Sequence, residues 1–210
     1  MSIQQIFKNI QKDTMPRLAP KPIADLAEHH EMFRQLEDFF GFLPNDYLTM
    51  GHKPAVMKAV VELTGAVLLS EGKTPMALRL LVMYVASRAA NCMYCTAHCA
   101  GLSLKYGLPM EKIQNIQDYK THHSFSDAER AALTVADKAN RLPNAVTDED
   151  FEELRKHYGD EAITEIVSQI AMMSFYNKWN DTLATTLEKP PFEMASSSLS
   201  WWSVGKHTMS

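Results

Sequence analysis

Apolar side chains recur at steps of three and four residues along most of the chain, the pattern of helices that bury one face. Residues 22–40 carry one such face and stop at Gly41, a residue that favours a helix end. Residues 54–69 and 75–90 are apolar on most sides, which predicts two helices enclosed by others. We find no strand-like alternation, so the predicted fold class is all-α, a single-domain helical bundle.

Helix-start and helix-stop residues divide the second half of the chain into further helices. Ser126 and Thr147 are each followed three positions later by an acidic residue, the arrangement of a capping box. The helices predicted here cover residues 91–106, 109–119, 126–142, 147–159 and 160–187.

Two terminal segments fall outside the predicted helical domain of residues 21–190. Residues 1–20 are polar and interrupted by prolines, so we expect an N-terminal arm there. A Pro-Pro pair is expected to stop the last helix. Residues 191–210 then form a flexible, serine-rich tail in which the Trp201-Trp202 pair is exposed.

Composition narrows the class of protein. The 21 Lys and Arg residues are dispersed and the net charge is −4, so no nucleic-acid partner is expected. The N-terminus has no export signal, and no apolar run reaches the ~20 residues of a membrane span, so no membrane partner is expected. All three cysteines lie close together, which leaves no disulfide framework and favours a cytoplasmic protein with catalytic thiols.

The cysteines form the motif Cys92-Met-Tyr-Cys95-Thr-Ala-His98-Cys99, which we expect at the start of a helix beginning near Asn91. Helix-start N–H groups favour an anion, so a thiol there has a pKa below the ~8.5 of a free cysteine. On a helix, His98 lies beside Cys95 and is turned roughly 120° from Cys92, so it is placed to serve Cys95. Only Cys92 and Cys95, at a helix start, can approach to the Cβ separation of about 3.5–4.5 Å that a disulfide requires.

Two other interpretations of the cysteines compete with this one. Free cysteines are often small buried apolar residues without chemistry. A zinc site would combine the CxxC thiolates with ring nitrogens of His122 and His123, but no second CxxC exists and one helical turn cannot surround a tetrahedral ion. Covalent haem attachment is excluded because Thr96 stands where a histidine is needed. We therefore expect no metal, haem or flavin cofactor.

The helix order and the cysteine segment resemble the alkylhydroperoxidase D / carboxymuconolactone decarboxylase family over roughly residues 39–188. Further strings resemble its peroxidase-related branch: Gly41-Phe-Leu-Pro-Asn45 with His52-Lys-Pro54, Phe125-Ser-Asp-Ala-Glu-Arg130, Val146-Thr-Asp-Glu-Asp-Phe151 and Asn177-Lys-Trp-Asn-Asp-Thr182. The resemblance implies a homo-oligomer of all-helical subunits that reduces a hydroperoxide and is reset by an external dithiol. It also implies that Cys95 is the attacking thiol and Cys92 its resolving partner.

The chain departs from the family pattern in two places. Cys99 stands where the family has its histidine, and His98 comes one position earlier. The family also has a relay glutamate before the first cysteine, where this chain reads Arg79-Leu80-Leu81. An acid is needed to orient and charge the imidazole, and Asp181 and Glu62 are candidates by residue type alone.

These observations predict a thiol-dependent peroxidase or dithiol oxidoreductase with Cys92, Cys95 and His98 as catalytic residues. The Cys95 thiolate attacks the terminal oxygen of a hydroperoxide, Cys92 condenses with the resulting sulfenic acid, and His98 acts as base toward Cys95. One alternative is a redox-responsive oligomeric interaction protein of the same fold without peroxidase turnover. Another is a lactone decarboxylase, which is disfavoured because such branches of the family do not depend on a cysteine pair.

Overall fold

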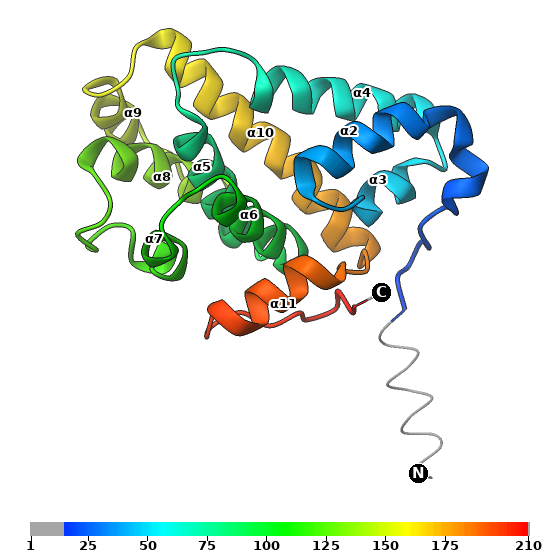
Figure 1. Ribbon diagram of the computed structural model, residues 1–210. Helices are drawn as coiled ribbons and strands as arrows, with labels where there is room; N and C mark the ends of the chain where they lie inside the picture. Colours follow the sequence, from blue (N-terminus) through cyan, green and yellow to red (C-terminus); the bar gives the residue numbers. More distant parts are fainter. Residues whose placement is uncertain (1–14, 210) are drawn as a thin grey trace.

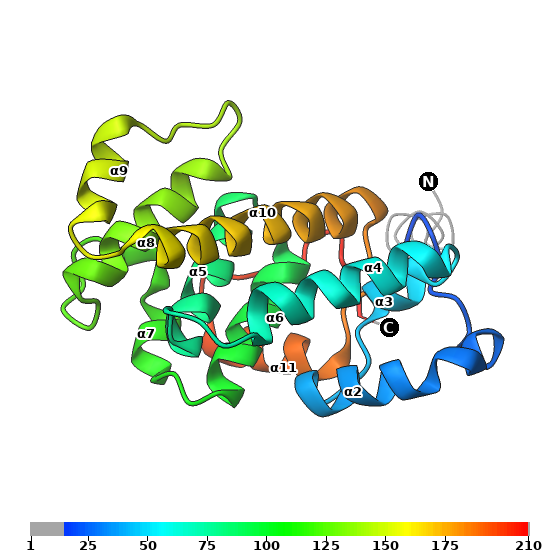
Figure 2. The same ribbon diagram turned by 90° about the horizontal axis from the view of Figure 1, so that it is seen from above.

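The computed structural model describes residues 15–209, and within that range the chain forms ten α-helices and no named β-strand (Figures 1 and 2). The predicted all-α class is confirmed. Residues 1–14 of the expected N-terminal arm lie outside the described residues. The part that follows is attached to the rest of the chain, because Arg17 donates hydrogen bonds to the carbonyl oxygens of Thr182 and Leu183 at 2.7 and 2.8 Å.

The element order agrees with the predicted sequence of helices as far as Leu183. The α-helices are α2 (His30–Phe40), α3 (Asn45–Met50), α4 (Pro54–Thr64), α5 (Met76–Ala89), α6 (Met93–Lys105), α7 (Met110–Gln114), α8 (Asp127–Ala139), α9 (Asp148–Arg155), α10 (Asp160–Leu183) and α11 (Lys189–Ser198). Three shorter elements complete the order: η1 (Ile23–His29), η2 (Gly65–Leu69) and η3 (Ile116–Asp118).

Two of the predicted helices are divided. The helix expected over residues 22–40 becomes η1 and α2, because His29, the N-cap of α2, leaves the helical region with φ of −109°. Gly41 ends α2 as expected, with a left-handed φ of 89° that a residue without Cβ adopts at little cost. The helix expected over residues 54–69 changes from α4 into the wider turn η2.

Helix α5 is the centre of the fold and packs against α6, α8 and α10. Leu80, Leu81 and Val82 are fully buried although they point in different directions, as expected for a helix that is apolar on most sides. Helix α6 lies between α5 and α11, and α10 crosses both α5 and α6 (Figures 1 and 2). None of the described helices is both long and apolar enough to span a membrane.

Both predicted capping boxes are present. The Ser126 hydroxyl accepts from the Glu129 N–H, and the Glu129 carboxylate accepts from the Ser126 N–H. Thr147 and Asp150 make the same reciprocal pair at the start of α9. In each box, two side-chain oxygens accept hydrogen bonds from two backbone N–H groups that would otherwise lack a partner at the helix start.

The C-terminal segment differs from the expected flexible tail. Pro190 and Pro191 lie in the first turn of α11, where a missing N–H costs no intrahelical bond, so they begin a helix rather than only stopping one. Trp202 is 8% exposed and donates from Nε1 to the Met93 carbonyl at 3.0 Å, so the expectation of an exposed Trp201-Trp202 pair is wrong. The chain then returns beside the segment that precedes α11 (Figure 1), where Leu187 donates to the Thr208 carbonyl at 2.8 Å.

Candidate active site

The cysteine helix α6 begins at Met93, and Cys92 is its N-cap residue. The Cys92 sulfur accepts a hydrogen bond from the Cys95 N–H at 3.4 Å, the contact that a serine or aspartate oxygen makes at other helix starts. Asn91, the expected N-cap, instead has a left-handed φ of 56° and lies one residue before the N-cap. The helix start therefore stabilises a negative charge on the Cys92 sulfur itself.

The three thiols are unpaired and buried, with exposures of 0% for Cys92, 3% for Cys95 and 2% for Cys99. Burial pushes the pKa of Cys92 up, but hydrogen bonds from Cys95 and His207 outweigh it and lower that pKa to about 6. Burial and the neighbouring Cys92 thiolate raise the pKa of Cys95 well above its ordinary value. Because the Cys92 sulfur accepts the helix N–H, the helix start favours the negative charge of the reduced pair on Cys92, whereas the sequence pattern had placed it on Cys95.

Cys99 is separate from this pair. Its sulfur lies 3.6 Å from the Ser87 hydroxyl, between α6 and α5. Burial raises the pKa of Cys99 to about 12, so it is a neutral thiol at physiological pH. Cys99 therefore fills core space at the position where the family has its histidine.

His98 is bound to a carboxylate that lies far away in the sequence. Its Nε2 pairs with Glu188 Oε2 at 2.8 Å, and its Nδ1 lies 3.0 Å from the Tyr94 carbonyl oxygen. Both partners are acceptors, so the ring carries a proton on each nitrogen. Burial alone would lower the pKa of His98, but the charge and hydrogen bonding of Glu188, together with Asp46, raise it. Since both nitrogens face acceptors, the surroundings of His98 favour the imidazolium, a proton donor, over the free base expected for Cys95.

Glu188 is thus the acid that pairs with His98 in this structure. It is the N-cap residue of α11, and its Oε1 also accepts from the Tyr94 hydroxyl at 2.9 Å and from the Asn45 N–H. The neighbourhood of Arg79 holds no acid that serves the cysteines: Arg79 is buried and donates to the carbonyl oxygens of Leu68 and Ser70. Glu62, one of the two expected substitutes, is exposed on α4.

A second buried carboxylate reaches Cys95 through an amide. Asn180 on α10 donates from Nδ2 to Asp46 Oδ2 at 3.1 Å and to the Cys95 sulfur at 3.5 Å. Burial raises the pKa of Asp46 to about 6, with the charge of His98 lowering it and that of Glu188 raising it. Asp46 therefore changes its protonation state near neutral pH, beside both the thiol pair and His98.

Asp181, the other expected substitute, serves a different histidine. Its Oδ1 lies 3.6 Å from Nε2 of His207, a residue of the C-terminal segment, and its Oδ2 accepts from Lys206 at 2.8 Å. His207 is 1% exposed and is one of the groups that lower the pKa of Cys92. The site therefore contains two histidine–carboxylate pairs, one at each end of the CxxC motif.

Cys95 and His98 face a small cavity, with about 40 Å³ open to the centre of a water molecule, and Cys92 is not part of its wall. Asp46, Tyr47 and Tyr176 also lie around the cavity, but their polar atoms bond to other protein groups, the two tyrosine hydroxyls to each other at 2.8 Å, and the open surface of the wall is almost wholly apolar. The remaining lining is mostly apolar and includes Phe40, Leu68, Met83, Leu102, Met172 and Met173. Cys95 and Cys99 both line this cavity, and of the two only Cys95 has Cys92 beside it as a partner for a disulfide.

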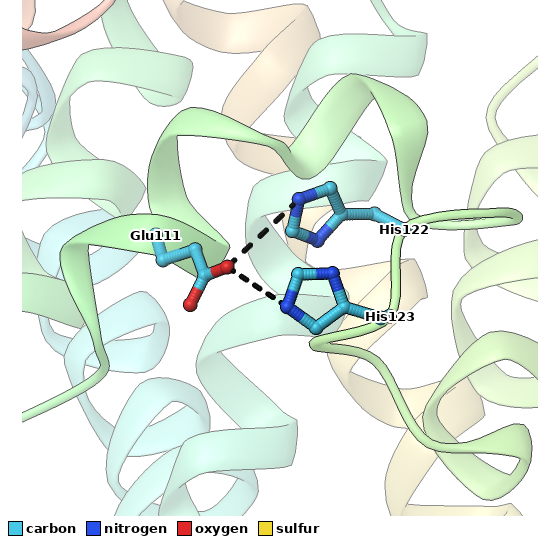
Figure 3. A group of neighbouring side chains, drawn as sticks. All are labelled: Glu111, His122 and His123. Atoms are coloured by element: carbon cyan, nitrogen blue, oxygen red, sulfur yellow. Dashed lines mark ion pairs between the residues drawn. The ribbon is translucent and has the colours of Figure 1, made fainter.

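His122 and His123 lie elsewhere, with Glu111 (Figure 3). Glu111 Oε1 is 3.1 Å from His123 Nε2 and 4.0 Å from His122 Nε2, and ligand atoms of all three lie within 4.8 Å of one another. These side chains could hold a divalent cation, but Glu111 and His123 are exposed. Among the described residues, no group with metal-ligand spacing includes a cysteine, so a zinc site built from the CxxC pair and this histidine pair is not formed.

The sequence pattern indicates the thiols and His98 but not Asp46, Asn180, Glu188 or His207. Two of these had a signal: Asn180 lies inside a family-like string, and Asp46 directly follows another. Glu188 precedes a Lys-Pro-Pro sequence that is typical of a helix start and could have been read as its N-cap. His207 had none, because an isolated histidine in a serine-rich segment gives no periodic pattern.

Comparisons with known proteins agree with this architecture. The model of the carboxymuconolactone decarboxylase family matches residues 54–138, which contain α4 to α8. The apo crystal structure of the debrominase Bmp8 is 30% identical and superimposes with a TM-score of 0.80, over 85% of this chain and 96% of that chain. A crystal structure of a cysteine-to-alanine variant of Bmp8 in complex with 2,3,4-tribromopyrrole is 29% identical and superimposes with a TM-score of 0.81. The match covers 86% of this chain and 96% of that chain.

A more distant structure shows the fold alone. The alkylhydroperoxidase AhpD core of an uncharacterized peroxidase-related protein from Ralstonia eutropha JMP134 is 24% identical, with a TM-score of 0.72, over 80% of this chain and 90% of that chain. No curated protein sequence matches the chain. With the match to the family model and the similarity to Bmp8 over nearly its whole length, the chain belongs to the carboxymuconolactone decarboxylase family, with an alkylhydroperoxidase D-like fold.

Proposed function

We propose that the protein is a thiol-dependent reductase that oxidises Cys92 and Cys95 to a disulfide while it reduces a small hydroperoxide. The observation that carries this proposal is the polarised thiol pair. An acidic Cys92 lies hydrogen-bonded to a neutral Cys95, and Cys95 lines an apolar cavity that also contains a protonated histidine. A structural pair of buried cysteines needs neither a helix start nor two histidine–carboxylate pairs around it.

The first step is attack on the hydroperoxide by Cys95. Cys95 transfers its proton to the Cys92 thiolate, which already accepts its hydrogen bond, and the Cys95 sulfur then attacks the terminal peroxide oxygen. The S–O bond forms, the O–O bond breaks, and the alkoxide takes a proton from His98 to leave as the alcohol. Cys95 is oxidised to the sulfenic acid, and His98 is left neutral beside Glu188.

The second step closes the disulfide. Cys92 loses its proton and attacks the Cys95 sulfur, the S–O bond breaks, and the hydroxide leaves as water. An external dithiol then reduces the disulfide and restores both thiols and the proton on His98. The same proposal includes an external dithiol donor and a homo-oligomeric assembly. It also includes a cytoplasmic location, because dithiol donors keep thiols reduced there.

Reductive dehalogenation is the second candidate function. The similarity to Bmp8, a debrominase, at 30% identity over 96% of that chain favours it, and so does the mostly apolar lining of the cavity. A dithiol supplies the two electrons that replace carbon–bromine by carbon–hydrogen, with bromide and a disulfide as the other products. His98 and Asp46 are the proton donors in the cavity wall for the new carbon–hydrogen bond.

Parallel turnover assays separate these functions. Reduced protein is given dithiothreitol with either cumene hydroperoxide or a brominated pyrrole, and alcohol or bromide formation is followed. We expect hydroperoxide turnover that Cys95→Ser abolishes and Cys99→Ala leaves unchanged. Bromide release without hydroperoxide turnover would replace the peroxidase by a dehalogenase. Reversible oxidation of the Cys92/Cys95 pair with no turnover of either substrate would instead favour a redox-responsive interaction protein.

A further inference from the structure

The loop before α8 places two histidines beside a glutamate of α7 (Figure 3). Glu111 lies in the first turn of α7, His122 and His123 follow η3, and none of the three lines the cavity beside the thiols. The two imidazole rings are 4.5 Å apart between centroids and 31° from parallel, and each presents Nε2 to Glu111 Oε1 (Figure 3). Two nitrogens and one oxygen from separate segments therefore converge on one point.

Buried neighbours and hydrogen bonds hold these segments in place. Ile113 anchors α7 and is 0% exposed, and Phe125 anchors the loop and is 1% exposed. The His122 N–H donates to the Asp118 carbonyl oxygen at 2.8 Å, and Arg130 of α8 donates to the His122 carbonyl oxygen at 3.0 Å. The backbone that carries the two histidines is therefore attached to η3 on one side and to α8 on the other.

A contact at the other ring nitrogen prepares His122 to bind a ligand. Its Nδ1 lies 2.9 Å from the Ser124 hydroxyl oxygen, which can accept the Nδ1 proton. The Ser124 N–H also approaches Nδ1, but at 3.4 Å this contact is longer than an ordinary hydrogen bond. With the proton on Nδ1, the lone pair of the neutral ring is on Nε2, the nitrogen that faces Glu111. Histidines that bind metals typically donate from the second ring nitrogen in this way.

The separations of the donor atoms fit a small divalent cation. Bonds of ~2.0–2.2 Å to tetrahedral zinc place the ligand atoms about 3.4 Å apart. Glu111 Oε1 is 3.1 Å from His123 Nε2 and 4.0 Å from His122 Nε2, and one donor atom of each residue lies within 4.8 Å of the others. The side chains of Glu111 and His123 are 53% and 80% exposed, so both can rotate toward the less exposed His122.

We propose that Glu111, His122 and His123 form a surface binding site for zinc or a similar divalent transition-metal cation. Two imidazole nitrogens and one carboxylate oxygen suit such an ion, whereas Mg²⁺ and Ca²⁺ prefer oxygen ligands alone. Three protein ligands leave the fourth tetrahedral position to water on the exposed side. The bound cation joins α7 to the loop before α8, and the site is independent of the CxxC thiols and of the dithiol function.

Isothermal titration calorimetry of zinc chloride into the full-length protein tests the site. The thiols are kept reduced with a phosphine, because dithiols bind zinc themselves. We expect saturable binding that His122→Ala and Glu111→Gln abolish, and that Ser124→Ala weakens about 10-fold because the Nδ1 proton loses its acceptor. His157→Ala is the matched control, because His157 also faces a glutamate, Glu153 at 3.5 Å, but belongs to no cluster of three ligands within residues 15–209. Its zinc affinity should equal that of the wild type.

A second measurement locates the ion on the protein. In proton NMR spectra, zinc should shift the ring resonances of two of the eight histidines, and these two are identified as the ones absent from His122→Ala and from His123→Ala. Magnesium at the same concentration should shift neither. Cys95→Ser shows whether the thiols take part, and it should bind zinc with the affinity of the wild type.

The outcomes decide the inference without any readout of thiol chemistry. Zinc binding that is lost in His122→Ala and retained in His157→Ala and Cys95→Ser supports the site, even if the protein turns over no hydroperoxide. Zinc binding that survives both His122→Ala and Glu111→Gln, or that Cys95→Ser removes, overturns the site because the ion is then held elsewhere. Absence of saturable zinc binding to the wild type overturns it as well. If His122→Ala does not fold, Glu111→Gln at its exposed position carries the test.

Discussion

Replacement of Asp46 by Asn tests the electrostatics of the site without changing its volume. Asp46 is 5% exposed, and its carboxylate accepts from the Tyr47 N–H at 2.8 Å and from Asn180 Nδ2 at 3.1 Å. In the variant, the side-chain oxygen of the introduced asparagine can still accept from the Tyr47 N–H. Its NH₂ group then faces the NH₂ group of Asn180, and the Asn180 side chain has to rotate to present its oxygen instead. This produces a stability change that is independent of pH, on which the titration of Asp46 is superimposed.

The magnitude follows from the raised pKa of Asp46. A rise from 3.8 to about 6 is about two pKa units, and at 1.36 kcal/mol per unit this corresponds to about 3 kcal/mol. Because the folded protein binds this proton more tightly than the unfolded chain, Asp46 contributes stability that is fully present below about pH 4. That contribution is lost as the pH rises through about 6. Wild type should therefore gain about 2.4 kcal/mol relative to Asp46→Asn between pH 8 and pH 4, because the unfolded carboxyl, with its pKa of 3.8, is still partly ionised at pH 4.

Urea unfolding of the reduced wild type and of Asp46→Asn across this pH range measures the difference directly. The same protein concentration is used throughout, so that any assembly affects both proteins alike. Subtraction removes the titration of groups that Asp46 does not influence and leaves that of the coupled Asp46 and His98. Parallel stability curves, with a constant difference between pH 4 and pH 8, would refute the raised pKa of Asp46 and its place in the proton network.

Three further changes test other parts of the site. Glu188→Gln should lower the pKa of His98 and reduce turnover near pH 7, and acidification should restore part of that turnover. The pH profile of kcat measures this effect. Glu193→Gln, an exposed position on the same helix, is the control. Cys99→Ala should leave kcat unchanged and cost about 1 kcal/mol by urea unfolding, because it removes only core volume; loss of turnover would contradict its assignment as a spectator. Tyr176→Phe should cost about 1–3 kcal/mol in the same unfolding assay, because it leaves buried hydroxyl partners unsatisfied, and an unchanged midpoint would count against that hydroxyl chain.

The helices were predictable where local rules decide. The capping boxes at Ser126 and Thr147 and the left-handed Gly41 depend on contacts within a few residues, and all three are as expected. The start of α6 was predicted one residue early, because Asn91 is the better cap by residue type and the use of the Cys92 sulfur depends on the turn before it. Helix α11 was not predicted because proline lacks an N–H, which ends a helix when the proline lies in its interior but is tolerated in a first turn. The Pro-Pro pair is therefore compatible with either a helix end or a helix start.

The electrostatics of the site could not be predicted from spacing along one helix. The spacing of His98 and Cys95 predicted that the two side chains lie beside each other on the helix, and both line the same cavity. It did not indicate that the ring nitrogens of His98 would be taken by Tyr94 and Glu188. The partners that decide which sulfur is charged come from α3, α10, the start of α11 and the end of the chain, and no sequence rule links such distant segments.

The most direct test of the dithiol chemistry is mass spectrometry of the reduced protein after one equivalent of cumene hydroperoxide. We predict loss of two hydrogens per chain and, after digestion, a single disulfide that joins Cys92 to Cys95, with Cys99 still a free thiol. A protein that leaves the hydroperoxide unreduced, or whose oxidation ends on Cys99 or in a Cys95 sulfinic acid without a disulfide, would contradict the account.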